Sequence, residues 1–137
     1  MGIVKTEITL KNLRDNILTR SGYLRPEDVR TETVTAVVDT GSTYLVITEE
    51  LRQKLGLEIL REKTAHIANG QQITCHLTET VEIQWKDRET TVPAMVIPGA
   101  KTILFGTIPL EALDLMVNPV TQEVIGAHGD EMIIIAL

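Results

Sequence analysis

Two strand-like runs of the chain are separated by a short segment of small residues, most of them polar. Thr31–Val38 is rich in threonine and valine, which is typical of a strand entering a core, and Tyr44–Ile47 resumes the apolar run. Between them, the sequence Asp-Thr-Gly-Ser at 39–42 must form a turn. Gly41 permits a tight turn with close backbone approach. The sequence therefore predicts two core strands joined by a turn that holds the carboxylate of Asp39 where the core opens.

Alternation of apolar and polar residues predicts strands along most of the remaining chain. Asn69 and Gly70, between two alternating segments, are a strong short-range hairpin signal. A second hairpin is predicted to turn at residues 86–88. The strands are expected at Ile3–Leu10, Thr31–Val38, Tyr44–Ile47, within Thr64–Val96, at Thr102–Gly106 and Val124-Ile125, and in the apolar run Met132–Leu137.

Helix signals occur twice. Thr48 is a good N-cap, Leu51 and Leu55 fall on one face, and Gly56 ends this first helix. Pro109 fits the first turn of a second helix, whose apolar face is expected to continue to Leu115.

Two further predictions concern the residue Asp114 and the segment between the first two strands. Asp114 is interpreted as a solvent-facing residue of the second helix. Lys11–Arg30 is polar and contains Gly and Pro, which predicts a surface loop.

Composition limits the classes of protein to be considered. The 137 residues fit one domain spanning 1–137, and the low aromatic content, 3%, requires an aliphatic core. A formal net charge of −6 disfavours nucleic acid or an anionic membrane as partner. The first ten residues lack a secretory apolar region. With Cys75 as its single cysteine, the chain has no intrachain disulfide, which predicts a reducing, cytoplasmic setting.

Three histidines raise the question of a metal site. His66 and His76 lie on opposite arms of the predicted Asn-Gly hairpin, and His128 lies near the end of the chain. No third ligand has a recognisable metal spacing. We therefore expect no metal and no cofactor, and we interpret Cys75 as a small core residue.

The tripeptide Asp39-Thr40-Gly41 alone admits two interpretations. The simpler one is an Asx-type turn, in which Asp39 accepts a hydrogen bond from its own backbone. The other is a catalytic carboxylate whose orientation is held by the hydroxyls of Thr40, Ser42 and Thr43.

The segment VVDTGSTYLVI with the following helix ELRQKLGL resembles the active-site region of retropepsin-like aspartic proteases, and it is most similar to the small prokaryotic clan AA members. The string LFGTIPLEALDLMVNPVTQEVIG resembles the closing segment of that group, and the Asn-Gly hairpin occupies the position of the flap. The resemblance covers nearly the whole chain. It implies a mainly β, closed retropepsin-like barrel with two short helices.

The resemblance also implies roles for the residues of the turn. Asp39 would be catalytic, and because the chain has no second turn of this kind, its partner would be Asp39 of a second copy in a two-fold symmetric homodimer. Thr40 would donate its hydroxyl across the two-fold axis, Gly41 would hold the turn, and Ser42 would bond the outer oxygen of the carboxylate.

The hairpin tip Ala68, Asn69, Gly70 and Gln71 would be the flap that covers an extended peptide or protein substrate. Met132–Leu137 would be either a strand of the dimer interface or a strand of the monomer's core.

These features together predict an aspartic endopeptidase. A peptide-binding or scaffolding module that keeps the fold without turnover is the alternative, and a structural β protein in which the motif is only a turn is a weaker one.

Overall fold

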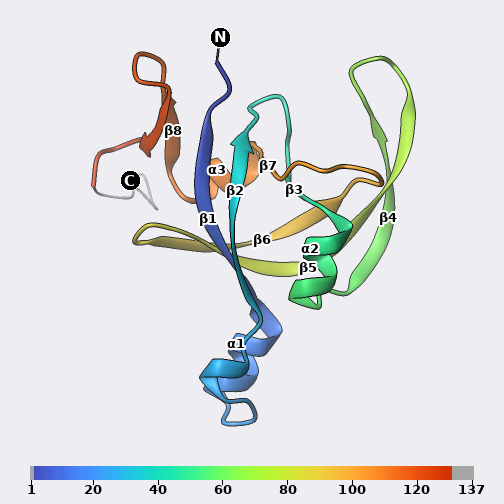
Figure 1. Ribbon diagram of the computed structural model, residues 1–137, viewed down its shortest axis with the longest axis vertical. Helices are drawn as coiled ribbons and strands as arrows, with labels where there is room; N and C mark the ends of the chain where they lie inside the picture. Colours follow the sequence, from blue (N-terminus) through green and yellow to red (C-terminus); the bar gives the residue numbers. More distant parts are fainter. Residues whose placement is uncertain (1, 131–137) are drawn as a thin grey trace, which may run out of the picture.

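The computed structural model describes residues 2–130, which form a mainly β protein with short helices (Figure 1). The helices are α1 (Leu13–Arg20), α2 (Glu49–Leu55) and α3 (Thr107–Ala112), with one turn of 3-10 helix at Pro26–Asp28. The strands are β1 (Lys5–Asn12), β2 (Thr31–Val38), β3 (Leu45–Ile47), β4 (Ile59–His66), β5 (Gln72–Trp85), β6 (Arg88–Val96), β7 (Leu104–Phe105), β8 (Leu115–Asn118) and β9 (Glu123–Gly126).

The main sheet closes on itself. Its strand order is β1-β2-β7-β3-β6-β5-β4. Because β1 also pairs with β5, the strands β1, β2, β7, β3, β6 and β5 form a ring, and β4 lies outside it. The long strand β5 makes this closure possible, because its first part pairs with β4 and its last part pairs with β1. The predicted mainly β fold with a closed sheet is confirmed, and β4 projects from the ring as one arm of the β4–β5 hairpin (Figure 1).

The core inside the ring is aliphatic, as the composition predicts. Most of its buried residues are isoleucine, leucine or valine, joined by Phe105 and Trp85. Trp85 keeps its polar atom satisfied, because Nε1 donates a hydrogen bond to Thr6 Oγ1 at 2.8 Å. A second, smaller cluster consists of Val46 of β3, Cys75 and Leu77 of β5, and Met95 of β6.

The local signals for α2 and for the two hairpins are confirmed. Thr48 caps α2 by accepting a hydrogen bond from the Leu51 amide at 3.1 Å, and Gly56 ends the helix with φ +64°. The Asn-Gly hairpin joins β4 and β5, and the second hairpin joins β5 and β6 with Trp85 paired to Arg88.

The interpretation of Lys11–Arg30 as a surface loop is wrong. The segment contains α1 and the 3-10 turn, and it projects from the ring at the end opposite the tip of the β4–β5 hairpin (Figure 1). The Asn12 side chain begins α1 by accepting a hydrogen bond from the Asp15 amide at 3.0 Å. In α1 the only buried residue is an aspartate, Asp15, so no apolar periodicity marks this helix in the sequence.

The second predicted helix extends too far. α3 ends at Ala112, and Leu115 begins β8, which pairs with β9. Asp114 has φ +54°, which ends the helix, so its interpretation as a solvent-facing helix residue is also wrong. Its carboxylate, only 15% exposed, lies 2.8 Å from Nδ1 of His128. The run Met132–Leu137 lies outside the described residues.

Candidate active site

The turn at residues 39–42 is held by a short strand that comes from far along the chain. β2 and β3, on either side of the turn, are not neighbours, because β7 lies between them. β7 runs parallel to β2 and antiparallel to β3. The Asp39 amide donates a hydrogen bond to the Phe105 carbonyl at 3.1 Å. Both ends of the turn are therefore fixed by one buried strand.

The start of α3 fixes the other side of the turn. The amides of Thr107 and Ile108 donate hydrogen bonds to the carbonyls of Ser42 and Thr43, each at 2.9 Å. Gly106 permits this approach: a Cβ there would lie 2.4 Å from the Tyr44 carbonyl oxygen, a backbone atom, and would clash with it.

The carboxylate of Asp39 is half-buried and oriented by the turn itself. Its Oδ1 accepts a hydrogen bond from the Gly41 amide at 2.9 Å, which is the Asx-type bond of the simpler sequence interpretation. Among the described residues, nothing hydrogen-bonds Oδ2. The turn therefore fixes one carboxylate oxygen and leaves the other available to an incoming group.

The hydroxyl residues of the turn differ in their surroundings. Thr40 is exposed at the tip of the turn. Ser42 is half-buried, and its hydroxyl donates to the Tyr44 carbonyl at 3.3 Å rather than to Asp39 within the described chain. The roles expected for Thr40 and Ser42 in a dimer stay predictions.

The tip of the β4–β5 hairpin is exposed and lies at the same end of the molecule as the turn (Figure 1). The Gly70 amide donates to the Ile67 carbonyl at 2.9 Å, and the Gln71 amide donates to Asn69 Oδ1 at 2.9 Å. Gly70 has φ +85°, a conformation that favours glycine. Ala68, the first residue of the tip, lines the space between hairpin and turn.

A groove of about 560 Å³ separates this hairpin from the turn. The turn provides one wall with Asp39 and Ser42, and the floor comes from the second core cluster, including Val46 and Met95. β4 provides the opposite wall from Lys63 onward. The groove therefore holds one carboxylate above an apolar floor, which suits a side chain and backbone of an extended ligand.

A second cavity, of about 410 Å³, lies on the other side of Asp39. Asp39 and Thr40 line it together with apolar residues of the first strand region and of β8, among them Ile3, Val4 and Val117. Asp39 thus lies between an apolar cavity on one side and the groove under the hairpin on the other.

The sequence analysis did not identify Lys63 and Tyr44 as residues of the site, although both line the groove. Lys63 Nζ lies 3.2 Å from the hydroxyl of Tyr44 and 5.6 Å from the centroid of its ring. β4 begins at Ile59, before the strand pattern that starts at Thr64, so Lys63 was not assigned to the hairpin. Only the alternation of Lys63, Ala65 and Ile67, each half-buried, could have revealed this face.

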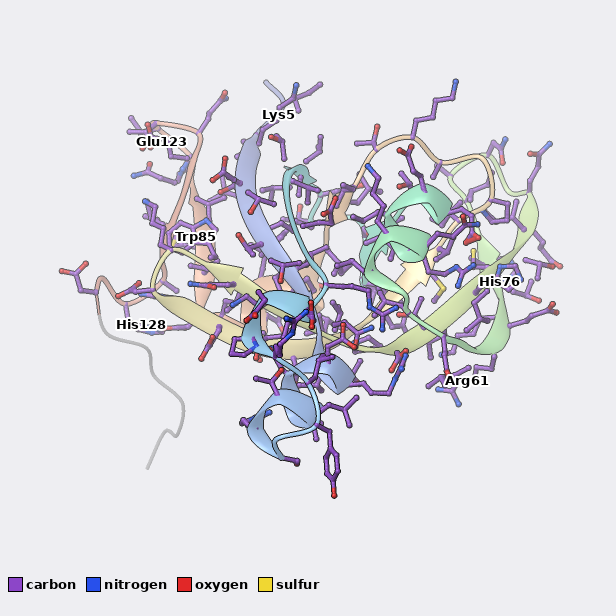
Figure 2. The ribbon with its side chains drawn as sticks, turned by 60° about the horizontal axis from the view of Figure 1, so that its bottom comes forward. Lys5, Arg61, His76, Trp85, Glu123 and His128 are labelled. Carbon is purple, nitrogen blue, oxygen red and sulfur yellow. The ribbon has the colours of Figure 1, made fainter. Side chains whose placement is uncertain are left out.

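The histidines and the cysteine have other surroundings. His76 and His128 lie at opposite ends of the molecule (Figure 2). Cys75 is fully buried in the second core cluster, and burial raises the pKa of its thiol, as expected for a small core residue. Over residues 2–130, no group of three potential metal ligands comes together. No helix in this range combines the length and the apolar composition that a membrane span requires.

Comparison with known proteins identifies the class. The model of the aspartyl protease family matches residues 27–126, well over half of the chain, a range that includes the turn, the hairpin and β7. The chain belongs to the aspartyl protease family, so the predicted retropepsin-like resemblance is confirmed at the level of the family. The search of curated proteins found no match.

Among solved structures, the EIAV protease in complex with the inhibitor HBY-793 is similar, with a TM-score of 0.48 and 19% sequence identity. The similarity covers 58% of this chain and 75% of that protein.

Proposed function

We propose that this chain is an aspartic endopeptidase that is active as a homodimer, with Asp39 of each copy forming the catalytic pair. The observation that carries the proposal is the acid content of the two cavities that meet at Asp39. Of the described residues that line them, Asp39 is the only aspartate or glutamate. Family membership supports peptide hydrolysis, and this chemistry needs two carboxylates, so a second copy of the chain is the source we propose for the other.

The surface beside the turn supports a second copy as the partner. Ile3 is 74% exposed, and together with Val117 it lines the apolar cavity next to Thr40. An apolar surface at this place would be covered by a symmetric copy that brings the two turns together. In that arrangement the exposed Thr40 of each copy would bond the turn of the other.

The proposed mechanism follows from two carboxylates at about 3 Å, which cannot both be ionised and therefore share one proton. The ionised carboxylate accepts a proton from a water molecule as that water attacks the peptide carbonyl carbon. The protonated carboxylate gives its proton to the carbonyl oxygen, and the carboxyl that took the proton from water then passes it to the amide nitrogen as the C–N bond breaks, which releases the amine and the carboxylic acid.

The substrate we propose is an extended peptide in the groove between turn and hairpin. The tip residues Ala68, Asn69, Gly70 and Gln71 would close over it, with backbone hydrogen bonds to the peptide as in strand addition. The apolar floor would take a side chain of the peptide.

The first test is the substitution Asp39→Asn. It removes the base but keeps size and shape, so we expect the fold and the dimer to persist while peptide cleavage falls by about 10²–10⁴-fold. Cleavage is measured on a peptide mixture by mass spectrometry, and dimerisation by sedimentation. Asp87→Asn, at the exposed turn between β5 and β6, is the matched control and should cleave normally.

Mixing the two proteins tests whether the pair spans two copies. With a threefold excess of Asp39→Asn, random exchange leaves each wild-type chain with a wild-type partner only about a quarter of the time. Activity per wild-type chain should then fall to about a quarter. Unchanged activity would show that one chain suffices, and normal cleavage by Asp39→Asn alone would disprove the proposal. Peptide binding without any cleavage would instead indicate the non-catalytic binding module.

A further inference from the structure

The groove under the hairpin contains one cationic side chain, that of Lys63. It extends from the half-buried face of β4 toward Tyr44, which follows the Asp39 turn. Its Nζ lies 3.2 Å from the Tyr44 hydroxyl and 5.6 Å from the centroid of the Tyr44 ring, so the ammonium group is located at the hydroxyl edge of the ring. The hydrogen bond to the Tyr44 hydroxyl is therefore the contact that positions this ammonium group.

Among the described residues, no carboxylate forms an ion pair with this ammonium group. Of the described residues that line the groove, Lys63 is the only lysine or arginine, and Asp39 is the only acid. An ammonium group has three donors, and the Tyr44 hydroxyl is the partner that Lys63 has here. Lys63 therefore has donors to offer to a ligand in the groove.

We propose that Lys63 and Tyr44 form a subsite that selects peptides with an aspartate or glutamate side chain. This inference rests on the proposed peptidase function, because it assigns the substrate class of the same groove. A carboxylate of the peptide would accept a hydrogen bond from Lys63 Nζ and one from the Tyr44 hydroxyl. A lysine or arginine in the same position would be repelled.

The net charge of the chain would not by itself produce a preference for acidic peptides. With a formal net charge of −6, the protein as a whole repels acidic peptides. A preference for acidic residues must therefore arise locally, within the groove. It must also weaken when salt screens the pair.

The test compares peptides that differ only by Glu, Gln or Lys at each position around the cleaved bond. We expect kcat/KM for Glu to exceed that for Gln by about tenfold at one position, a difference of about 1.4 kcal/mol. Lys63→Met should reduce this ratio to about one, and Lys63→Glu should reverse the preference toward Lys. All of these comparisons are made at pH 7.

Lys54→Met is the matched control. Lys54 lies on the exposed side of α2, where it pairs with Glu50 at 3.4 Å, and it does not line the groove. The control should keep the wild-type ratio. A wild-type ratio of one at every position, or a ratio that survives Lys63→Met, would overturn the proposal.

A binding measurement separates this proposal from the peptidase function. The Asp39→Asn protein is immobilised and incubated with an uncut peptide mixture, and the retained peptides are sequenced by mass spectrometry. Enrichment of acidic peptides that disappears in Asp39→Asn/Lys63→Met supports the subsite even where the wild-type protein cleaves nothing. Cleavage without any acidic preference would overturn the subsite and leave the peptidase function standing, and retention without acidic enrichment would also overturn it.

Discussion

Gly106 shows how one residue outside the turn fixes the position of Asp39. A methyl group there would lie 2.4 Å from the Tyr44 carbonyl oxygen and 2.6 Å from that of Ser42. Because both are backbone atoms, the turn itself must move to make room. The hydrogen bonds that the turn accepts from the amides of α3 would lengthen, and the carboxylate of Asp39 would shift.

We therefore expect Gly106→Ala to reduce cleavage by about 10²-fold, the scale of effect that a displacement of about 1 Å produces at a reacting group. The measurement is kcat/KM together with the free energy of unfolding from urea titration. Gly22→Ala is the control, since its methyl enters open space but at φ +82° strains the backbone. The control should lose stability and keep activity; equal kcat/KM for both variants would contradict the role of Gly106.

At this scale, the residues that could be predicted are those whose signal is local. The turn around Asp39 and the hairpin at Asn69 and Gly70 are recognisable because the residues act on their own backbone. Gly106 and Lys63 act on residues about 20 to 60 positions away, and only the fold brings them there. Their contacts with Ser42 and Tyr44 had no local signal in the sequence.

The sequence did not predict α1 or the corner where α1 meets β2 and α2. Its centre is polar: Asn12 Nδ2 donates to the Leu55 carbonyl at 2.7 Å, and Asp15 accepts from the backbone amide and the guanidinium of Arg30. Buried polar residues give the same hydropathy pattern as a surface loop. The pattern therefore predicts a loop where the structure has a helix. The capped helix α2, whose apolar face is buried, was predicted correctly.

This corner predicts a pH dependence of stability. The hydrogen bonds from Arg30 lower the pKa of Asp15 below its usual value, against the opposing effect of burial. The folded-state pKa is the depressed one. The contribution is therefore fully present above the unfolded pKa of about 4, and it is lost as pH falls through the folded value.

We expect Asp15→Asn to lower the free energy of unfolding by about 1–3 kcal/mol at pH 7 and by progressively less below about pH 4. Urea titrations across this range provide the measurement. Asp28→Asn is the control, because the partner of Asp28, Arg25, is 74% exposed and an ion pair of this kind contributes little. Equal stability of wild type and Asp15→Asn at pH 7 would contradict this account of the corner.

The whole molecule carries a net negative charge, which matters for association with a second copy of itself. Two copies, each with a formal net charge of −6, repel one another, so the proposed dimer depends on apolar contact beside Thr40. Salt weakens the repulsion and leaves the apolar contact in place. We therefore expect the dimer to strengthen as ionic strength rises, and specific activity to increase with protein concentration, because a monomer supplies only one Asp39.

Ile3→Asp tests the proposed face directly, since Ile3 lines the apolar cavity next to Asp39. The added charge should shift sedimentation toward the monomer, and activity should fall at micromolar protein and recover in part at higher concentration. Tyr23→Asp makes a similar change at a side chain that is 82% exposed in the α1–β2 segment, away from this face, and should leave both measurements unchanged. A monomeric Ile3→Asp protein with full activity would disprove the dimer as the active form, because a single Asp39 would then have to supply both the base and the acid.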